Sequence, residues 1–361
     1  MKLVIFGLTV TSSWGNGHAT LWRSLIRALT RRGHRVTFFE RDVSWYADAR
    51  DLGEMPGLDT VLYPDWDGIR SRAAREVAEA DVAMVTSYCP DGPAASEIVL
   101  AGRAARVFYD LDTPVTLAAL AAGERPAYLP LQGLGGFDLV LSFTGGTALD
   151  RLRAELGARR VLPLYGSADP ETHRPVPPVS EYRADLSYLG TYAADRQPAL
   201  QALFLDPARQ RPQHRFVIGG AQYPADFPWT ENIHFVRHMP PQLHPAFFSS
   251  SRLTLNVTRR AMAEAGWCPS GRLFEAAACG AALLSDSWPG LSDFYTPGQE
   301  ILIARDTADA MAAIDCGEAE LRRIAARARQ RTLDEHSGDR RAQELEAALE
   351  TIAAAPLPTE A

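Results

Sequence analysis

The chain has 361 residues, 46% of them hydrophobic and 22% charged, with a formal net charge of −7 at pH 7. This length exceeds what one ordinary hydrophobic core supports, so two domains are expected, and the composition is typical of a soluble globular protein. Nucleic-acid-binding proteins usually carry a basic surplus, so the acidic balance predicts no nucleic-acid partner.

The cysteines and the N-terminus indicate a compartment. Cys89, Cys268, Cys279 and Cys316 form no CxxC or metal-ligand spacing, which is typical of reduced thiols. The first apolar run, "MKLVIFGLTV", leads directly into the loop "TSSWGNGH", and no run approaches 18 apolar residues. We therefore expect no signal peptide, no membrane span and a cytoplasmic location.

The first half of the chain alternates strand and helix patterns. A helix is predicted at 18–32, because five apolar residues between Leu21 and Leu29 share one face and Gly33 follows. Alternation of this kind predicts right-handed crossovers and a parallel sheet. The predicted strands are 2–8, 35–40, 60–64, 82–88, 106–110 and 138–144.

Proline and turn residues interrupt the pattern at 163–184, and the alternation then restarts. Strands are predicted at 185–190, 214–220, 233–238, 252–257 and 300–304, with a helix at 197–205 and a helical region from about 308 to 352. We predict two Rossmann-like, doubly wound parallel-sheet α/β domains facing one another across a cleft, with ligands at the carboxyl ends of the strands. Their expected bounds are 1–165 and 185–335, with a hinge at 166–184 and a C-terminal helix and tail at 336–361 that packs back on the first domain.

The stretch "CPSGRLFEAAACGAALLSD" (268–286) places charged side chains in a small, apolar segment. Ser270 is a good helix N-cap and Gly280 the matching stop, so Arg272 and Glu275 share one helical face near the N-terminal end. A helix N-terminus and an arginine fork suit phosphate, and a carboxylate suits paired sugar hydroxyls. The pattern indicates a diphosphate next to a ribose, with a surface Arg–Glu pair as the alternative.

The same region resembles a known family. "PSGRLFEAAACGAALLSDSWPGL", "DLSYLGTYAADRQPAL", "RFVIGGAQYP" and "GQEIL" stand in the order typical of GT-B glycosyltransferases, and resemble in particular the CgeB-like, spore-protein-related group. The resemblance implies an enzyme of hexosyltransferase type that moves a sugar from a nucleotide-diphosphate sugar to a hydroxyl-bearing acceptor. It implies no metal and no cofactor, with the donor bound by the second domain and the acceptor, an unspecified small molecule, glycan or protein, by the first.

The resemblance also implies roles for single residues. Glu275 would bind the ribose hydroxyls and Arg272 would lie beside the diphosphate. Large retaining families carry two glutamates separated by seven residues, but Trp267 stands at the first position here, so no retaining mechanism is carried over. The further donor-binding candidates are Ser270, Gly271, Thr191, Arg196, His238, Gly290 and Leu291.

The loop "SSWGNGHAT" (12–20) is similar to N-terminal glycine loops of GT-B enzymes. Gly15, Asn16 and Gly17 are acceptor-side candidates, and His18 is a candidate catalytic base, with a capping or packing role as the alternative. A dinucleotide fingerprint with Glu40 is a weaker interpretation, since Thr20 replaces its third glycine.

A second candidate base lies in "YDLDTP" (109–114). Asp112 could line the cleft, with a turn role before Pro114 as the alternative. The Asp110-x-Asp112 spelling is the metal motif of another glycosyltransferase fold, so we expect no metal here. Two further functions stay open: a nucleotide-sugar epimerase or hydrolase on the same fold, and a non-catalytic nucleotide-binding or assembly protein.

Overall fold

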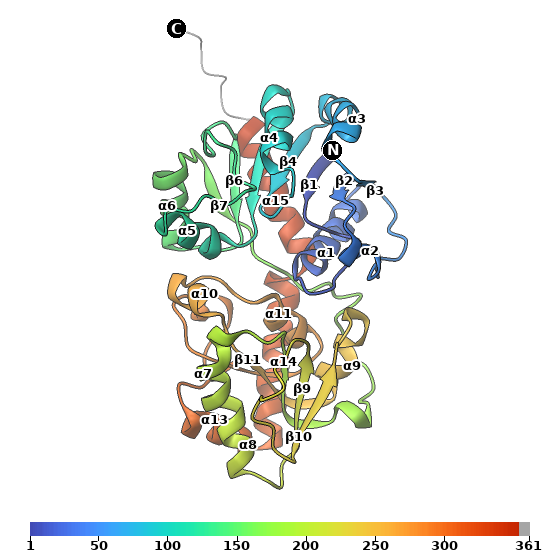
Figure 1. The fold of residues 1–361 in the computed structure, drawn as a ribbon. Coiled ribbons are helices and arrows are strands. Elements are labelled where there is room, and N and C mark those ends of the chain that lie inside the picture. Colours follow the sequence, from blue (N-terminus) through green and yellow to red (C-terminus); the bar gives the residue numbers. More distant parts are fainter. Residues whose placement is uncertain (354–361) are drawn as a thin grey trace. The chain divides into compact units, whose positions relative to one another are not determined.

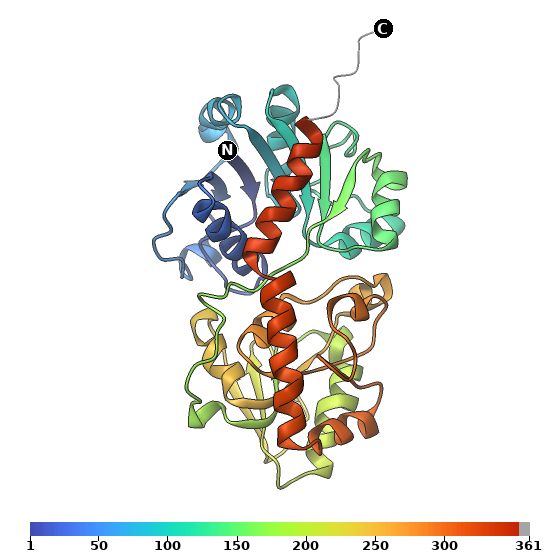
Figure 2. The same cartoon turned by 180° about the vertical axis from the view of Figure 1, so that it is seen from behind.

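The computed structural model describes residues 1–353, which divide between two compact units (Figures 1 and 2). The first contains Met1–Tyr165 and the segment that begins at Gly338, and the second contains Gly166–Ser337. The chain therefore passes from one unit to the other twice.

The segment 166–184, expected to be a hinge, is packed within the second unit. Ala168 forms a β-bridge with Ser337, and the backbone N–H groups of Val176 and Val179 donate to the hydroxyls of Ser249 and Ser250 at 3.1 and 2.8 Å. The proline-rich composition of this segment marks irregular backbone, which these contacts fix in place. Of the expected tail, residues 354–361 lie outside the described part of the chain.

The first unit is built on a seven-stranded parallel sheet of order β3-β2-β1-β4-β5-β6-β7. Its strands are β1 (Lys2–Gly7), β2 (Arg35–Arg41), β3 (Leu58–Tyr63), β4 (Val82–Thr86), β5 (Ala105–Asp110), β6 (Leu139–Ser142) and β7 (Val161–Pro163). Its helices are α1 (His18–Arg31), α2 (Ser44–Ala47), α3 (Trp66–Ala78), α4 (Gly92–Ala101), α5 (Thr113–Ala121), α6 (Thr147–Leu156) and α15 (Gly338–Ala353). The central strands are buried on both faces, which explains their continuous apolar runs.

Helices cover both faces of this sheet. One core contains buried residues of α3, α4 and α6, and the other contains Trp22 and Leu25 of α1 together with Leu345 of α15. Figure 2 shows α15, in red, lying along the sheet of this unit. Ion pairs between α1 and α15, such as Arg31–Asp339 at 3.1 Å, border the apolar contact.

The second unit is built on a six-stranded parallel sheet of order β10-β9-β8-β11-β12-β13. Its strands are β8 (Ala184–Leu189), β9 (Phe216–Gly220), β10 (Ile233–Arg237), β11 (Ser251–Asn256), β12 (Ala282–Ser285) and β13 (Leu302–Ile303). Its α-helices are α7 (Gln197–Leu200), α8 (Asp206–Gln210), α9 (His244–Ser249), α10 (Arg260–Ala265), α11 (Gly271–Ala278), α12 (Leu291–Phe294), α13 (Thr307–Ile314) and α14 (Glu318–Glu335), with 3₁₀ turns η1 (Ser180–Tyr182), η2 (Ala194–Arg196) and η4 (Pro241–Leu243).

Two predicted elements differ from the structure. The helix predicted at 197–205 continues to Gln210 through a π-helical turn, Gln201–Leu205 (η3), just before Pro207, which lacks the N–H that a regular helix would use there. The strand predicted at 300–304 is reduced to β13, which pairs with β12 by two residues only.

Strand order fixes where ligands can bind. In each sheet the connections change direction next to the first strand, between β1 and β4 in one unit and between β8 and β11 in the other. The crevice outside the carboxyl ends of such strands is the usual ligand site of a doubly wound sheet. Within residues 1–353, no helix combines the length and apolar character that a membrane crossing needs.

Candidate functional site

A small pocket of about 20 Å³, lined by both apolar and polar side chains, lies in the second unit at the carboxyl ends of β8 and β11. Its wall includes Tyr188 and Leu189 at the end of β8, Asn256 at the end of β11, and Ser270 and Arg272 at the start of α11. Arg196, from the loop that follows β8, completes it. Three predicted donor-site residues, Arg196, Ser270 and Arg272, are thus brought together at the switch point of this sheet.

The two arginines have unused hydrogen-bonding capacity. The Nε atoms of Arg196 and Arg272 are buried and have no hydrogen-bond partner among the described residues, although Nη1 of Arg196 donates to the Thr191 carbonyl at 3.2 Å. Burial lowers the pKa of Arg272, and the charge of Arg196 adds to this effect while Glu275 opposes it. Arginine stays charged in proteins. Two positive groups with unpaired donors in one pocket are suited to a multiply charged anion.

The start of α11 adds to this preference. The Ser270 hydroxyl accepts a hydrogen bond from the backbone N–H of Arg272 at 3.3 Å, so Ser270 is the N-cap, as the sequence predicts. Around Gly271, no atom other than those of its two chain neighbours and the helix backbone lies within 4 Å of the position that a Cβ would occupy, so a ligand can approach the backbone there. The positive end of the helix therefore reinforces the two guanidinium groups.

The Glu275 side chain contacts two histidines and does not form part of the pocket wall. The residue is only 6% exposed, and its Oε2 lies 3.2 Å from Nδ1 of His244 and 4.0 Å from Nε2 of His173. Burial would raise the pKa of Glu275, but its interactions with His173 and His244, including the hydrogen bond from His244, lower it to about 2. The buried carboxylate is thus compensated by two imidazoles, and both contacts use Oε2.

These three side chains are grouped closely enough to hold a metal ion, since one ligand atom of each lies within 4.8 Å of the others. The hydrogen bonds favour a different arrangement. Nδ1 of His173 accepts from the Asp169 N–H at 3.2 Å, which places the imidazole proton on Nε2, facing Glu275. Nε2 of His244 faces the Met239 carbonyl at 3.3 Å, so both nitrogens of His244 face acceptors. The nitrogens that face the carboxylate are therefore N–H donors, whereas a metal ligand needs a free lone pair on the coordinating nitrogen.

Glu275→Gln is expected to destabilise the second unit by about 2–3 kcal/mol at neutral pH. The folded-state pKa lies below the unfolded value of 4.5, so the carboxylate adds stability above pH 4.5 and loses it as the pH falls toward 2. The difference in the free energy of unfolding between wild type and Glu275→Gln should therefore become smaller at acid pH. Urea unfolding at about pH 7 and about pH 3 measures it, with exposed Glu320→Gln as the control. A gap independent of pH would contradict the assigned charge state.

The other predicted donor residues lie outside the pocket wall. Gly290 and Leu291 contact Trp267 or the core: a Cβ at Gly290 would lie 2.6 Å from the Trp267 ring, and Leu291 is buried. His238 adopts a positive φ of 55° after β10, with its N–H bonded to the Gly220 carbonyl at 2.7 Å. Trp267 is held over the Gly290 loop, where its indole N–H donates to Asp293 at 2.6 Å.

The first unit brings the two candidate bases into contact. His18 begins α1 and Asp112 precedes α5, and Nε2 of His18 lies 3.2 Å from Oδ2 of Asp112. Nδ1 of His18 is buried without a hydrogen-bond partner in the described chain. The ring of Tyr88, which follows β4, meets the His18 ring edge-to-face at 5.5 Å. A carboxylate that accepts from Nε2–H leaves Nδ1 as the basic nitrogen.

Asp110 is a second carboxyl group next to this pair. It is fully buried, its Oδ1 accepts from the Asp112 N–H at 3.2 Å, and its Oδ2 has no hydrogen-bond partner within residues 1–353. Burial raises its pKa to about 6. The two aspartates thus have different environments: the Asp110 carboxyl is buried, whereas the Asp112 carboxylate faces His18.

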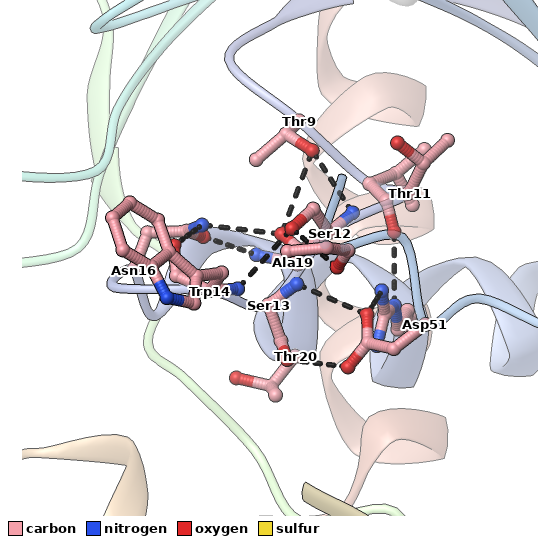
Figure 3. A network of polar contacts seen from close by, with 12 residues as sticks. Thr9, Thr11, Ser12, Ser13, Trp14, Asn16, Ala19, Thr20 and Asp51 are labelled. Carbon is pink, nitrogen blue, oxygen red and sulfur yellow. Dashed lines mark hydrogen bonds and ion pairs between the residues drawn. The ribbon is translucent and has the colours of Figure 1, made fainter. Parts of the chain in front are cut away.

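A network of polar contacts fixes the loop that carries the acceptor-side candidates (Figure 3). Asn16 Nδ2 donates to the carbonyls of Ser12 and Trp14 at 3.1 Å, and its Oδ1 accepts from the Ala19 N–H at the start of α1. Gly15 has a φ of 67°, which favours glycine, and Gly17 is the N-cap residue. The loop geometry thereby positions His18.

The carboxylate of Glu40 is hydrogen-bonded to the first residues of the same loop. Its buried carboxylate accepts from the Thr9 hydroxyl at 2.8 Å, the Val10 N–H at 2.7 Å, and both the N–H and hydroxyl of Thr11 at 3.0 and 2.5 Å. The dinucleotide interpretation requires this carboxylate to bind a ribose. With its oxygens already occupied, Glu40 instead holds the loop in place.

His173 and His244 were missed by the sequence interpretation, and Tyr88 and Asp110 were given no separate role in it. His173 and His244 lie far from Glu275 in sequence and follow no spacing. Tyr88 has a positive φ of 61°, a backbone state that its side chain does not signal.

The comparison with protein families matches residues 196–347 to the family described as glycosyl transferase-like, Glyco_trans_1_2. This segment is about two fifths of the chain and includes Arg196, Arg272 and Glu275. No curated protein sequence matches the chain. The finer resemblance to the CgeB-like group stays a prediction.

Solved structures match nearly the whole chain. Sucrose-phosphate synthase from Thermosynechococcus elongatus has 14% identity and a TM-score of 0.70, covering 98% of this chain and 100% of that one. HepE of Anabaena, in complex with UDP and glucose, has 13% identity and a TM-score of 0.66, covering 97% and 100%. An alpha-glucosyltransferase in complex with UDP has 13% identity and a TM-score of 0.69, again covering 97% and 100%. The chain therefore has the GT-B glycosyltransferase fold of two parallel-sheet α/β domains, and residues 196–347 match the glycosyl transferase-like family.

Proposed function

We propose that the protein is a glycosyltransferase that moves a sugar from a nucleotide-diphosphate sugar to a hydroxyl-bearing acceptor. The observation that carries the proposal is the pocket at the switch point of the second sheet, where Arg196 and Arg272 present buried, unpaired Nε–H donors next to the N-terminus of α11. A diphosphate carries the charge and the oxygens that such a pocket is suited to bind.

The chemistry assigns one task to each unit. In the second, the two arginines and the start of α11 stabilise the negative charge that develops on the leaving diphosphate as its bond to the sugar carbon breaks. In the first, Nδ1 of His18 takes the proton from the acceptor hydroxyl as the new glycosidic bond forms, while Asp112 holds the ring and stabilises its positive charge.

The donor is proposed to be a UDP-hexose, because two of the similar structures contain UDP, one of them together with glucose. Glu275 is buried and does not line the pocket; it is proposed to contribute to ribose binding through Oε1, since its contacts with His244 and His173 use Oε2. The remaining donor-site predictions, Thr191, His238, Gly290 and Leu291, are second-rank candidates because they do not line the pocket.

Binding and turnover test the proposal separately. Calorimetric titration with UDP, GDP, dTDP and NAD identifies the nucleotide, and release of UDP from UDP-glucose and UDP-galactose is followed with and without added acceptors. Binding of a nucleoside diphosphate with acceptor-dependent release supports the transferase. Release that no acceptor accelerates would indicate a hydrolase, and binding without release would indicate a non-catalytic protein. Binding of NAD alone would overturn the donor assignment.

A further inference from the structure

Two tryptophans of the first unit are exposed to an unusual degree. Trp45 is 58% exposed and Trp14 45% exposed, whereas Trp22 of the same unit is fully buried. Trp14 lies in the loop after β1, and Trp45 lies on the short helix α2 after β2. Single exposed apolar residues are normal, but two indoles on adjacent loops need an explanation when both are held in fixed positions.

The backbone beneath Trp14 is rigid. Ser13 donates to Asp51 through both its N–H and its hydroxyl, at 3.1 and 2.5 Å, and Arg23 donates to the same carboxylate at 2.6 Å. Burial acts to raise the pKa of Asp51, but these bonds hold it below its usual value, so the carboxylate is charged at neutral pH. Figure 3 shows the Trp14 indole beside Asn16, on the side of the network away from Asp51.

The loops that carry the two indoles are joined by hydrogen bonds, since the Ser12 hydroxyl donates to the Ala49 carbonyl at 2.8 Å and the Ser13 N–H donates to Asp51. Asn16 donates to the Trp14 carbonyl at 3.1 Å, which fixes the backbone of this residue. Tyr46 is 9% exposed, and its ring centroid lies 6.1 Å from that of Trp45. The backbone of both loops is therefore held by hydrogen bonds, and little backbone freedom would be lost when a ligand binds.

The position of the pair relates it to the catalytic base. Trp14 and His18 belong to the same loop, with His18 four residues further on at the start of α1. Both indoles follow adjacent strands, β1 and β2, at the carboxyl edge of the sheet. A molecule that contacts Trp14 is therefore bound by the same loop that ends at His18, the proposed base.

The charge around the two tryptophans favours a neutral sugar over an anionic lipid surface as the ligand. The exposed charged residues between positions 42 and 54 are Asp42 and Arg50, which form an ion pair at 2.5 Å, and Asp48 and Glu54, which leave an acidic excess. An anionic lipid surface is attracted by basic clusters, which this segment lacks. Neutral sugar rings present an apolar C–H face that packs on an indole and hydroxyls that bond to nearby carboxylates, so the acidic rim and the exposed rings both suit them.

We propose that Trp14 and Trp45 form a platform that binds a sugar ring of a carbohydrate acceptor. The inference rests on the proposed function for its link to transfer, and it deepens that function by naming the acceptor class as a neutral glycan. Binding of the glycan itself needs no donor and no turnover.

The experiment measures glycan binding by the full chain in the absence of nucleotide. Wild type, Trp14→Ala, Trp45→Ala and the control Trp229→Ala are applied to immobilised neutral gluco-, manno-, galacto- and xylo-oligosaccharides, and the bound sugar is then titrated in solution. Trp229 is a 36% exposed tryptophan of the other unit. Each platform variant should bind about tenfold more weakly, while Trp229→Ala binds as wild type does. Because both side chains are exposed, the melting temperatures should stay close to that of wild type.

UDP affinity, measured on the same samples, separates this inference from the proposed function. Unchanged UDP binding with lost glycan binding supports the platform. Failure of the wild type to bind any of these sugars, or equal binding by the platform variants, would overturn it even if UDP binds. Loss of binding to phosphatidylglycerol–phosphatidylcholine vesicles in place of sugars would assign the two indoles to a membrane surface.

Discussion

Replacing Arg272 by alanine is expected to weaken UDP binding by about 10- to 100-fold, the value of one or two charge-assisted hydrogen bonds. The loss should come without a loss of stability. Burial and the charge of Arg196 lower the pKa of Arg272 by more than Glu275 raises it, which means that the folded protein carries this charge at a cost in the absence of ligand. The melting temperature of ligand-free Arg272→Ala should therefore equal or exceed that of wild type.

Comparison of UDP with uridine locates the effect on the diphosphate. If Arg272 contacts phosphate, Arg272→Ala should lose affinity for UDP and keep its affinity for uridine, and Arg272→Lys should recover only part of the loss because lysine lacks the fork geometry. The control is Arg305→Ala, which removes a largely exposed arginine of the same unit. An equal loss for uridine and UDP in the titrations would place the diphosphate elsewhere.

Much of the fold could be predicted because the central strands are buried on both faces and read as apolar runs. The strands at 2–7 and 82–86 were predicted within two residues of their ends for this reason. β7 and β13 were missed or overextended because they are edge strands of two or three residues, too short for an alternating or apolar pattern. The π-helical turn of η3 depends on a proline two residues beyond it, which a helical periodicity does not register.

The sequence predicted those features of the candidate sites that depend on neighbouring residues in the chain. Ser270 and Arg272 could be read from one helix start, because capping and anion preference depend on neighbouring residues. The partners of Glu275 could not be, because His173 and His244 reach it only through tertiary packing. Likewise, His18 and Asp112 were proposed as alternative bases, and only the structure shows that they lie in contact at 3.2 Å.

His18→Ala is expected to lower the turnover rate about 10²- to 10⁴-fold, the range found when a general base is removed. UDP binding should not change, because the donor pocket is formed by residues of the second unit. UDP release from the donor sugar at saturating concentration measures the rate, and calorimetric titration measures UDP affinity. His18→Gln, which keeps a polar side chain but supplies no base, should be impaired as severely as the alanine variant.

Asp112→Asn tests whether the pair acts as a unit. An amide at position 112 can donate to Nε2, which would place the imidazole proton on Nδ1 and remove the basic lone pair from that atom. The variant should therefore lose most of the turnover that His18→Ala loses, and the double variant should be no slower than the slower single one. Multiplied losses in the double variant would mean that the two side chains act independently. Full activity of His18→Ala with impaired Asp112→Asn would transfer the role of base to Asp112.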